Sequence, residues 1–445
     1  MATPVSALEL GEAFSPIRVV DVELTKPLPS IRYDGRSRDV WVLGRLHTEP
    51  VGACVVHLGQ EGLTPGQLSM QLWRELRKPV TERFTAAGLS VPGELSGSGL
   101  ESDPLAWPFL RRRSELLAAA PFISVVICTR DRPDQLVTCL RHLDQQMYPH
   151  FEVVVVENVP TGDTVRTLVQ ARQGRMPYRY VVEPRSGLSW ARNTGVAAAS
   201  GEIIAFLDDD DEPDNHWLAG LANGFARSTD IGCVTGLVVP ARLDTPAQEL
   251  FEQLGGHSQG RGFELATFSR HGPQDPLFPL PPFGVGANMA FRREVLACIG
   301  GFDVALGAGT PSLAGAETLA FTLTLLAGYR IAYEPAALMR HHHRRDLDGL
   351  RRQLHGYSVG LTAYYAALMR HRPTAALALP RLAPRAASYL RNTAVQRSTV
   401  SPDVLARLNR RHRQGMLVGP LAYVRSMLKQ AGVARSRAVT PDRRQ

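Results

Sequence analysis

The chain has 445 residues, which is too long for one ordinary domain, and its 44% hydrophobic and 21% charged residues exclude disorder along most of its length. Its 39 glycines and 32 prolines follow no fixed period, which excludes collagen and solenoid repeats. The formal net charge of +8 points first to nucleic acid, a membrane surface or an anionic substrate.

The cysteine pattern and the N-terminus indicate a cytoplasmic protein. Five scattered cysteines, mostly inside apolar runs, favour reduced core residues over a disulfide framework or a zinc site. The first residues lack the basic start and the continuous apolar segment of a secretory signal. No apolar stretch reaches the ~18–20 residues that a membrane helix needs. We expect at most a peripheral position at the inner face of the membrane.

Residues 1–92 are predicted to form a small α+β accessory domain. The expected elements are strands at 39–46 and 52–58 and a helix at 64–87, which begins at Thr64 and ends before Gly88. Residues 93–120 are predicted as a linker, because the segment starts with a cluster of Gly, Ser, Pro and acidic residues.

Between residues 122 and 211, apolar runs alternate with helical patterns. The expected strands are 123–128, 151–156, 178–182 and 203–207, and the expected helices are 133–146, 163–172 and 189–199. Nearly continuous Val/Ile runs with helical connections predict a parallel sheet buried on both faces. Ligands bind at the carboxyl ends of such strands. The polar residues that follow the four strands are Thr129, Arg130 and Asp131, then Glu157 and Asn158, then Glu183 and Arg185, and finally Asp208–Asp211.

The acidic run Asp208-Asp209-Asp210-Asp211 is the sharpest chemical signal. Adjacent carboxylates repel one another, so their grouping at a strand end favours a compensating cation. In an extended segment Asp208 and Asp210 face one way and Asp209 and Asp211 the other. Mg²⁺ or Mn²⁺ binds such carboxylates together with phosphate oxygens. The alternative is a solvated turn in which Asp211 caps a helix at 213–221, and the run alone does not decide between the two.

The surrounding sequence resembles the nucleotide-sugar half of the family 2 glycosyltransferases, from about residue 122 to about 345. The blocks that carry the resemblance are PFISVVICTRDRPDQL, FEVVVVENVP, EPRSGLSWARNTGVAAASGEIIAFLDDDDEPDNHWL, GVGANMAFRREVLACIGGFDVALGAGTP, and a helix starting at Glu317 that leads to LLAGYRIAYEP and a His-rich end. The resemblance implies a GT-A fold, which is a Rossmann-like, mixed but largely parallel α/β sheet flanked by helices. It places the GT-A domain at 121–346 and leaves 347–445 as a helical, basic C-terminal region.

The resemblance also implies roles for the donor side of the site. Asp208-x-Asp210 matches the motif that holds a metal on the donor diphosphate, and Asp209 lies within it. The residues implied in nucleotide binding are Thr129, Arg130, Asp131, Glu157, Arg185, Gly187, Arg192 and Asp209. At the position of Glu157 the family usually has Asp. Arg192 has an alternative interpretation, because an arginine on the flank of a helix is often only solvated. Asn288 is implied as a sugar or acceptor contact, in a segment whose small residues also suit a packing turn.

The general base is where the chain departs from the family, which commonly has Gly-Gly-Glu-Asp before an apolar helix. A gapless alignment puts Ala316 on the Glu and Glu317 on the Asp, so that Glu317 is the implied base. The alternative frame puts Glu317 on the Glu and Thr318 on the Asp, which leaves no base. Glu317 is also an ordinary first-turn residue of a helix.

The His-rich end supplies the last implied ligands. His341 and His343 match a His-x-His pattern that gives the family a further metal ligand or a diphosphate contact. Imidazole suits Mn²⁺ better than Mg²⁺. The alternative is a basic surface formed by the three histidines and the arginines that follow them.

The positive charge belongs to the end of the chain. Residues 372–445 carry 15 Lys/Arg against two Asp, a local net charge of +13, which leaves about −5 for the rest. The tail lacks interleaved aromatic residues, so we expect no nucleic-acid partner. An apolar stripe in 350–369 followed by the basic tail leaves a peripheral contact with anionic lipids as an alternative to a solvated face.

The expected function is an inverting, metal-dependent transfer of a sugar from a nucleotide-diphosphate sugar, with Mn²⁺ or Mg²⁺ as cofactor. The acceptor is a hydroxyl of a glycan, a lipid-linked molecule or a small molecule. The alternative function is a sugar-nucleotide-binding scaffold that retains the fold without catalysis, and Ala316 is the residue that favours it.

Overall fold

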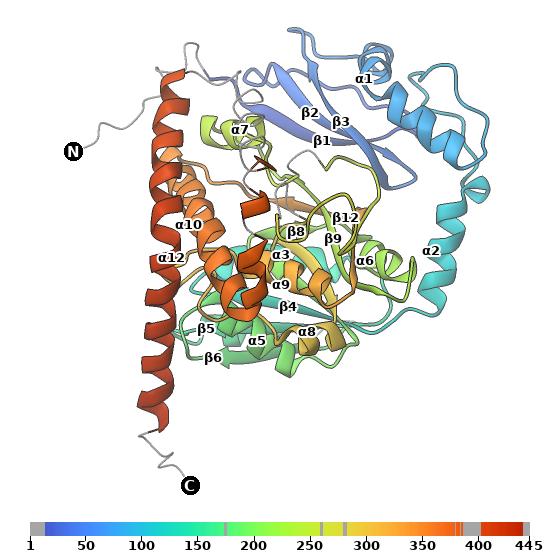
Figure 1. Cartoon of the computed structure of the whole chain (residues 1–445). Coiled ribbons are helices and arrows are strands. Elements are labelled where there is room, and N and C mark those ends of the chain that lie inside the picture. Colours follow the sequence, from blue (N-terminus) through green and yellow to red (C-terminus); the bar gives the residue numbers. More distant parts are fainter. Residues whose placement is uncertain are drawn as a thin grey trace.

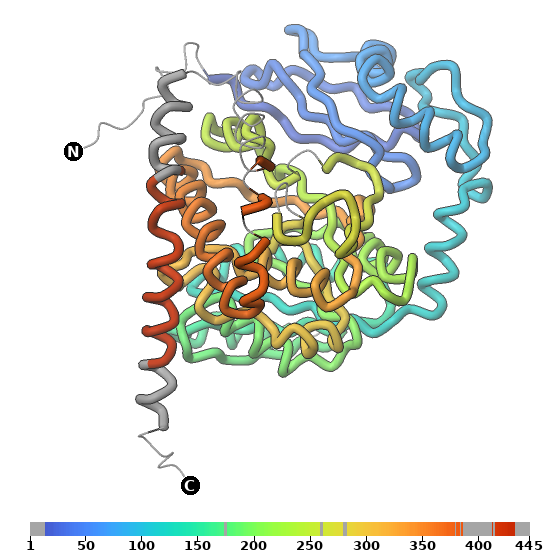
Figure 2. The backbone as a smooth tube through the Cα atoms, viewed as in Figure 1, coloured from blue at the N-terminus to red at the C-terminus, as the bar shows by residue number. Residues whose placement is uncertain are grey.

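The N-terminal sheet contains one strand more than the sequence predicts. The computed structural model describes residues 14–172, 176–258, 261–278, 283–378, 380–382, 384–385 and 402–438, so the start and end of the chain and residues 386–401 lie outside the described part (Figure 2). Strands β1 (Ile17–Glu23) and β2 (Asp39–Leu46) pair in parallel, and β2 pairs antiparallel with β3 (Glu49–His57). Helix α1 (Pro65–Ala86) begins after Thr64, whose hydroxyl caps the Gln67 amide, and it packs Leu68, Leu72 and Leu76 into the core of this sheet.

The segment predicted as a linker is partly helical. It contains a 3₁₀ turn, η2 (Pro104–Ala106), and helix α2 (Pro108–Ala118), with Pro108 at a position in the first turn where a missing N–H costs nothing. Trp107, only 2% exposed, packs edge-on against Phe84 of α1. The composition of the segment hides this helix, because the anchoring comes from a tertiary contact.

The larger sheet has nine strands, with the path order β10-β12-β9-β11-β7-β4-β5-β6 and β8 paired to β12 off this path (Figure 1). Its strands are β4 (Ile123–Thr129), β5 (Phe151–Asn158), β6 (Tyr178–Glu183), β7 (Ile203–Asp208), β8 (Asp211–Pro213), β9 (Ile231–Pro240), β10 (Ala266–Phe268), β11 (Asn288–Arg292) and β12 (Arg330–His341). Strands β6, β5, β4 and β7 run parallel, and β11 then enters antiparallel between β7 and β9. The predicted parallel sheet is confirmed for the four strands that the sequence identified, and the strands beyond them make the sheet mixed.

Each face of this sheet is covered by its own hydrophobic core. On one face, Val125 and Ile127 of β4 meet α3 (Pro133–Asp144), α4 (Thr164–Gln170) and α6 (Trp217–Ala226). On the other face, Val126 meets α5 (Leu188–Ala198), α8 (Arg293–Ile299) and α9 (Ala316–Leu326). The period-two alternation of a strand therefore serves two buried faces, which explains why the sequence shows unbroken apolar runs.

The prediction that Asp211 caps a helix at 213–221 is wrong. The chain continues extended after the acidic run, and Asp211 begins the short strand β8. Helix α6 starts only at Trp217, with His216 at its N-cap position. The reason is pairing, because β8 pairs antiparallel with the end of β12 and thereby uses backbone groups that a helix start would leave free.

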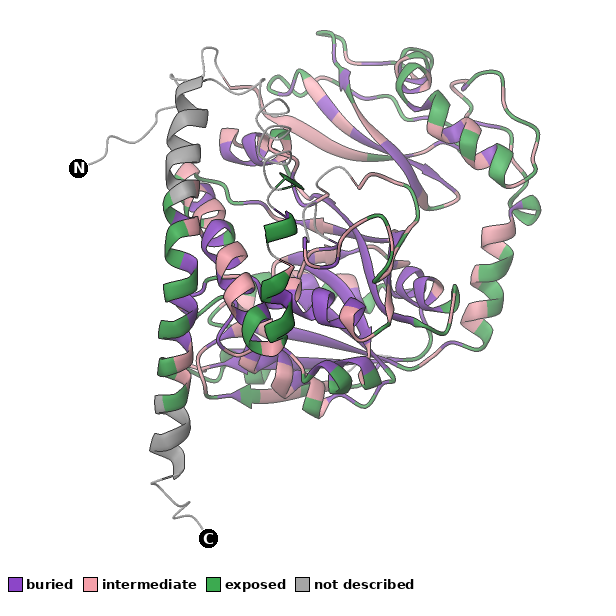
Figure 3. Ribbon diagram, viewed as in Figure 1, coloured by how far each residue is buried: buried purple, intermediate pink, exposed green. Residues whose placement is uncertain are grey.

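The C-terminal region packs two helices side by side. Helix α10 (Leu347–His371) confirms the predicted helical pattern, and α12 (Pro402–Ala438) lies along it at the edge of the molecule (Figure 1). Gly415 and Gly419 permit this approach, since a Cβ at Gly419 would lie 2.4 Å from the Val359 carbonyl oxygen. Between residues 414 and 431, the face of α12 turned away from α10 is exposed (Figure 3). The side chains of Arg407, Arg410, Arg411 and Arg413, part of the predicted basic tail, lie outside the described residues, and none of the described helices is long and apolar enough to cross a membrane.

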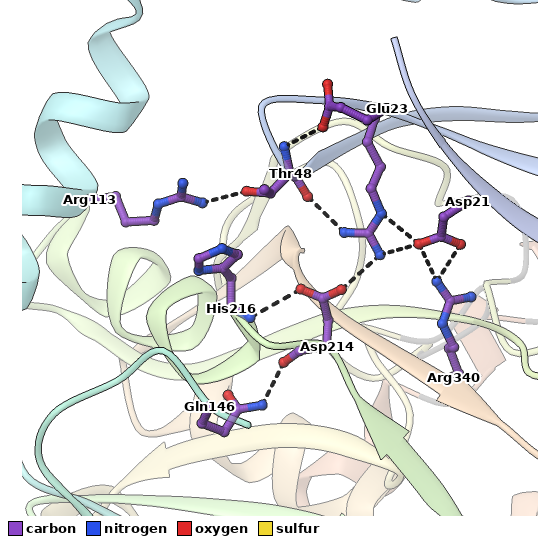
Figure 4. Close-up of polar contacts among 9 residues, drawn as sticks. Asp21, Glu23, Thr48, Arg113, Gln146, Asp214, His216 and Arg340 are labelled. Atoms are coloured by element: carbon purple, nitrogen blue, oxygen red, sulfur yellow. Dashed lines mark hydrogen bonds and ion pairs between the residues drawn. The ribbon is translucent and has the colours of Figure 1, made fainter. Parts of the chain in front are cut away.

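The N-terminal sheet is joined to the larger sheet by an apolar patch and a charged network. Leu43 of β2 packs with Leu237 of β9 and Tyr333 of β12. Beside this patch, Arg45 donates to Asp21 and to Asp214, both at 2.7 Å (Figure 4). Arg340 of β12 also donates to Asp21. The Arg45 side chain is 10% exposed, so its two ion pairs are shielded from solvent screening.

We predict that Arg45→Met destabilises the protein by about 2–4 kcal/mol, because Asp21 and Asp214 lose a shielded cation while remaining partly buried. Denaturant unfolding of the full chain measures the effect. Arg74→Met is the matched control, since Arg74 is 69% exposed and pairs only with Glu75, and it should stay within about 0.5 kcal/mol. Equal effects of the two substitutions would contradict the prediction.

Candidate active site

The candidate site lies where the winding of the parallel strands reverses. The chain builds β4, β5 and β6 outward in one direction and then returns to place β7 on the other side of β4. At the carboxyl ends, Cys128 pairs in register with Asp208 and Thr129 pairs with Glu157. Such a switch point is where open α/β sheets leave a crevice for ligands. The residues predicted from the strand ends therefore meet at one edge of the sheet.

Asp209 is held inside the protein by two donors. It is 5% exposed, and its carboxylate accepts a 2.7 Å hydrogen bond from the Thr129 hydroxyl. Arg132 donates to Asp209 at 3.2 Å and to Asp210 at 3.5 Å. Burial raises the pKa of Asp209, and the contacts with Thr129 and Arg132 oppose that shift. The sequence analysis did not single out Arg132, which sits in the turn before α3.

Asp208 and Glu317 face a shared buried arginine. Arg192, only 3% exposed, places Nη2 3.7 Å from Asp208 Oδ1 and Nη1 3.9 Å from Glu317 Oε2. Its Nη2 also donates to the Gly286 carbonyl at 3.2 Å, whereas Nη1 makes no hydrogen bond. A Cβ at Gly286 would come within 3.1 Å of that guanidinium and 3.3 Å of the Glu317 carboxyl carbon. Gly286 therefore leaves room for the arginine and the glutamate to approach.

Burial governs the charge of the acidic run. About a third of the Asp208 side chain is exposed (36%), yet the protein around its carboxyl raises the pKa of Asp208 to about 7 by desolvation, against the opposing effect of Arg192. Asp211 is 1% exposed, and desolvation raises its pKa well above the usual range. Within the part of the chain that the structure describes, neither oxygen of Asp211 has a hydrogen-bond partner. Such a group is costly unless a cation or a proton satisfies it.

The grouping of possible metal ligands differs from the predicted one. Strand β8 pairs with β12 so that Asp211 stands opposite His341. The ligand atoms of Asp210, Asp211 and His341 lie within 4.8 Å of one another. The structure thus brings the predicted ligands Asp210 and His341 together and adds Asp211, while Asp208 faces Arg192 instead. Pairing between β8 and β12 was not visible in the sequence, so Asp211 was assigned to the opposite side.

His343 belongs to a second cluster, which contains a histidine that the sequence analysis missed. The ligand atoms of His257, His341 and His343 also lie within 4.8 Å of one another, and all three rings are buried. His342, between the two predicted ligands, points elsewhere and bonds to Glu212 at 2.7 Å. The alternative of a basic surface is wrong for His341 and His343. His257 gives no signal in the sequence, because it stands alone in a glycine-rich loop.

The predicted nucleotide side is pre-formed by hydrogen bonds. Glu157, 2% exposed, accepts a hydrogen bond from the Tyr180 hydroxyl. Arg185 donates to both oxygens of Glu183, at 2.8 and 2.6 Å, and its guanidinium carbon lies 3.5 Å from the centroid of a Trp190 ring. The hydrogen bonds from Arg185 lower the pKa of Glu183 against the opposing effect of burial. The Glu183 carboxylate and the face of the Trp190 ring therefore fix Arg185 near the carboxyl ends of the strands.

The loops that border this side are held by backbone geometry. Gly187 has φ of 139°, which a side chain would disfavour, and its amide donates to Asn158 Oδ1 at 3.0 Å. The Asn158 amide in turn donates to the Arg185 carbonyl at 2.7 Å. Arg130 and Asp131 lie nearer the solvent, and the Asp131 carboxylate accepts from Thr161 at 2.6 Å. Asn158, noted only for its place at a strand end, therefore organises this part of the site.

Asn288 requires a correction. The structure does not place it for a sugar or acceptor contact, because it is 0% exposed inside the sheet. Its oxygen accepts from the Trp217 indole at 2.9 Å, and its amide donates to the carbonyls of Leu237 and Ala337. Its hydrogen bonds instead join β9, β11, β12 and α6. The small residues beside Asn288 suggested a position open to a ligand, whereas the side chain is enclosed by the protein.

The strand order and the acidic strand end define a mixed, largely parallel α/β domain whose switch point lies beside the acidic run. Residues 124–300 match the model of the family described as glycosyl transferase family 2. The succinoglycan biosynthesis protein ExoM of Rhizobium meliloti is 30% identical over 225 residues, covering 48% of this chain and 65% of ExoM. The glycosyltransferase AglE of Haloferax volcanii is 35% identical over 109 residues, covering 23% of this chain and 35% of AglE. The chain thus spans less than two thirds of the length of either relative.

One more relative and one solved structure complete the comparison. The glucosyl-dolichyl phosphate glucuronosyltransferase of Haloferax volcanii is 23% identical over 241 residues, covering 51% of this chain and 72% of that protein. The structure of the mannosyltransferase PcManGT from Pyrobaculum calidifontis, in complex with GDP-Man and Mn²⁺, has a TM-score of 0.42 and 20% identity, covering 72% of this chain and 92% of PcManGT. A TM-score of this size adds nothing to the assignment of the site.

We predict that the metal-free protein loses stability as the pH rises from about 4 to about 7, partly through Asp208. Its pKa is raised in the folded state, so the folded state holds a proton that the unfolded state has released across this window. In Asp208→Asn the decrease in the free energy of unfolding between these pH values should be smaller by roughly 1–2 kcal/mol. This figure allows for solvent screening, because the Asp208 side chain is partly exposed.

Urea unfolding at pH 5 and pH 7.5 with a chelator present tests this prediction. Asp163→Asn, at a carboxylate whose side chain is 74% exposed, is the control and should leave the pH dependence of wild type intact. The same pH dependence in Asp208→Asn as in wild type would contradict the role of Asp208.

Proposed function

We propose that the protein transfers a sugar from a nucleotide-diphosphate sugar to an acceptor hydroxyl with inversion at the anomeric carbon. The family 2 match over residues 124–300 supports the class of reaction. The observation that carries the proposal for this chain is the approach of Glu317 and Asp208 to opposite nitrogens of the Arg192 guanidinium. A carboxylate from the start of α9 is thereby fixed beside the acidic end of β7, as general-base chemistry next to a donor diphosphate requires.

The divalent cation of this reaction, Mn²⁺ or Mg²⁺, fits the residues present. Asp210 and Asp211 would hold it, with His341 beside them, since the ligand atoms of these three lie within 4.8 Å of one another. The unpaired, buried oxygens of Asp211 are the observation that favours a cation there. When bound, the cation offsets the negative charge of the leaving nucleotide diphosphate.

The chain's own residues position the donor. We assign nucleotide contacts to Thr129, Glu157 and Arg185 at the ends of three neighbouring parallel strands. Gly187 and the start of α5 bring backbone N–H groups to the same edge, where they favour an anion. Arg192 is too buried for a solvated surface role, and we assign it to orienting the carboxylates of Asp208 and Glu317.

Glu317 is assigned as the base that removes the acceptor proton. Helix α9 begins at Ala316, after Gly315 in the left-handed region (φ of 95°). The Ala316 side chain is buried at 1%, so the first side chain of the helix that reaches the site is Glu317. This placement supports the gapless alignment over the frame that would put Thr318 on the base.

The remaining parts of the chain are proposed to support the transfer domain. We assign residues 121–346 to sugar transfer, residues 1–92 to an accessory domain and residues 347–445 to a helical support. Residues 1–13 and 386–401 are among those that the structure does not describe. A second candidate function is a scaffold that binds sugar nucleotides without turnover. The small, buried Ala316 in place of a carboxylate is the observation that favours it.

We predict that Glu317→Gln lowers kcat by about 10²–10⁴-fold while nucleotide binding survives, because only the proton acceptor is lost. Donor turnover with Mn²⁺ and the thermal-shift response to nucleotide sugars are the two measurements. Glu294→Gln is the matched control, since Glu294 is an exposed first-turn glutamate of the neighbouring helix α8, and it should keep wild-type turnover.

The same measurements separate transfer from scaffolding. A wild-type protein that shifts its melting midpoint with nucleotide sugars yet turns over none of a broad donor and acceptor panel would be a scaffold. Unchanged turnover in Glu317→Gln would remove Glu317 as the base and return the choice to another carboxylate.

A further inference from the structure

Three buried histidines converge at the end of β12. His341 and His343 come from that strand and from the residues directly after it, and His257 comes from the loop that follows α7 (Pro246–Gln253). The three rings are 7%, 3% and 8% exposed in that order. The ring centroids of His257 and His341 are 4.3 Å apart, and those of His341 and His343 are 5.1 Å apart. One nitrogen from each ring lies within 4.8 Å of the other two.

The hydrogen bonds of this cluster direct its ring nitrogens toward one another. His343 Nε2 lies 2.8 Å from Glu252 Oε1, which fixes the proton on Nε2 and makes Nδ1 of His343 an acceptor. His341 Nδ1 donates to this Nδ1 at 2.9 Å, and a bound cation would replace the proton between the two rings. Among the described residues, none forms a hydrogen bond with the buried Nε2 of His257. An unpaired polar atom in such a place indicates that something absent from the protein chain satisfies it.

The groups around the histidines support this arrangement. Gly256 has φ of 52°, and a Cβ there would lie 2.3 Å from Glu252 Oε1, so this glycine clears the space that the carboxylate occupies. Phe251 packs edge-on against both His257 and His343 and keeps the rings in place.

We propose that His257, His341 and His343 bind a nitrogen-preferring divalent cation, Zn²⁺ foremost, at a site distinct from the one provided by the acidic run. Imidazole nitrogens suit Zn²⁺, whereas the carboxylates of Asp210 and Asp211 suit Mg²⁺ or Mn²⁺. Two nitrogens bound to one tetrahedral zinc at about 2.0–2.1 Å lie about 3.3 Å apart, so the Nδ1 atoms of His341 and His343 need to separate by only a few tenths of an ångström. Glu252 then completes the carboxylate–histidine–metal arrangement that orients such ligands.

The site goes beyond the transfer reaction and affects it through His341. This ring belongs to both clusters, the histidine one and the one with Asp210 and Asp211. Binding through Nδ1 leaves the proton on the other ring nitrogen, which suits a neighbouring carboxylate. Zinc would therefore fix the orientation of His341 beside the acidic pair without taking part in sugar transfer.

Zinc stoichiometry and affinity test the proposal on the full chain, with no need for transfer activity. After removal of metals with a chelator and equilibrium dialysis against Zn²⁺, wild type should hold about one zinc per chain that excess Mg²⁺ does not displace. His257→Ala should weaken zinc binding by more than about tenfold, and Glu252→Gln by roughly tenfold. His342→Ala is the matched control, because this neighbouring ring bonds to Glu212 outside the cluster, and it should bind zinc as wild type does.

Two outcomes would overturn the proposal. Wild type that retains no zinc, or equal zinc affinity in His257→Ala and His342→Ala, would show that the histidines are only packed against one another. Should His257→Ala fail to fold, the visible spectrum of Co²⁺ bound to wild type decides, since nitrogen ligation at low coordination number gives intense bands. A weak, octahedral water-like spectrum would rule the site out.

Discussion

The structure depends on how four consecutive carboxylates are kept at the end of a buried strand. Asp208–Asp211 cannot turn outward into solvent, because β7 is fixed between β4 and β11 and the chain then pairs as β8 with β12. Protein charge compensates part of the run, through Arg192 beside Asp208 and Arg132 beside Asp209 and Asp210. Asp211 has no such partner. The part of the charge that the protein leaves uncompensated is what supports the cation that we propose there.

The N-terminal sheet contributes to the same constraint from outside. Asp214 follows β8, and Arg340 precedes His341 at the end of β12, so both lie on the segments that bring the acidic run and the histidines together. Arg45 binds Asp214, and Asp21 binds both Arg45 and Arg340 (Figure 4). Charged groups of opposite sign from a separate sheet thereby fix the two segments that carry the ligands. This coupling gives the accessory sheet a physical connection to the chemistry of the site.

Local sequence patterns predicted most of the helices and strands. The features that they did not predict depend on pairing between segments that are far apart in the sequence. The strands at 123–128, 151–156, 178–182 and 203–207 and the helix at 64–87 were foreseen, because periodicity, capping and apolar runs are local signals. The short strand β8 was not, since three residues gain their extended form only by pairing with β12. His257 and Asp211 were missed for the same reason, as each acquires meaning only beside His341. Asn288 was misassigned because its sequence neighbours do not reveal its hydrogen-bond partners Trp217, Leu237 and Ala337.

The positive charge of the C-terminal region is carried in part by a helix that packs against the rest of the protein. The tail that supplies most of the positive charge contains helix α12, which packs along α10 and reaches Trp190 of α5. Gln430 of α12 accepts a 2.8 Å hydrogen bond from the Trp190 indole, and Arg185 stacks on that same side chain. Arg185 is therefore held from two sides. Glu183 accepts its hydrogen bonds, and Trp190, which is itself bonded to α12, packs against its guanidinium. Helix α12 is therefore part of the structure that holds in place the arginine that we propose for the donor.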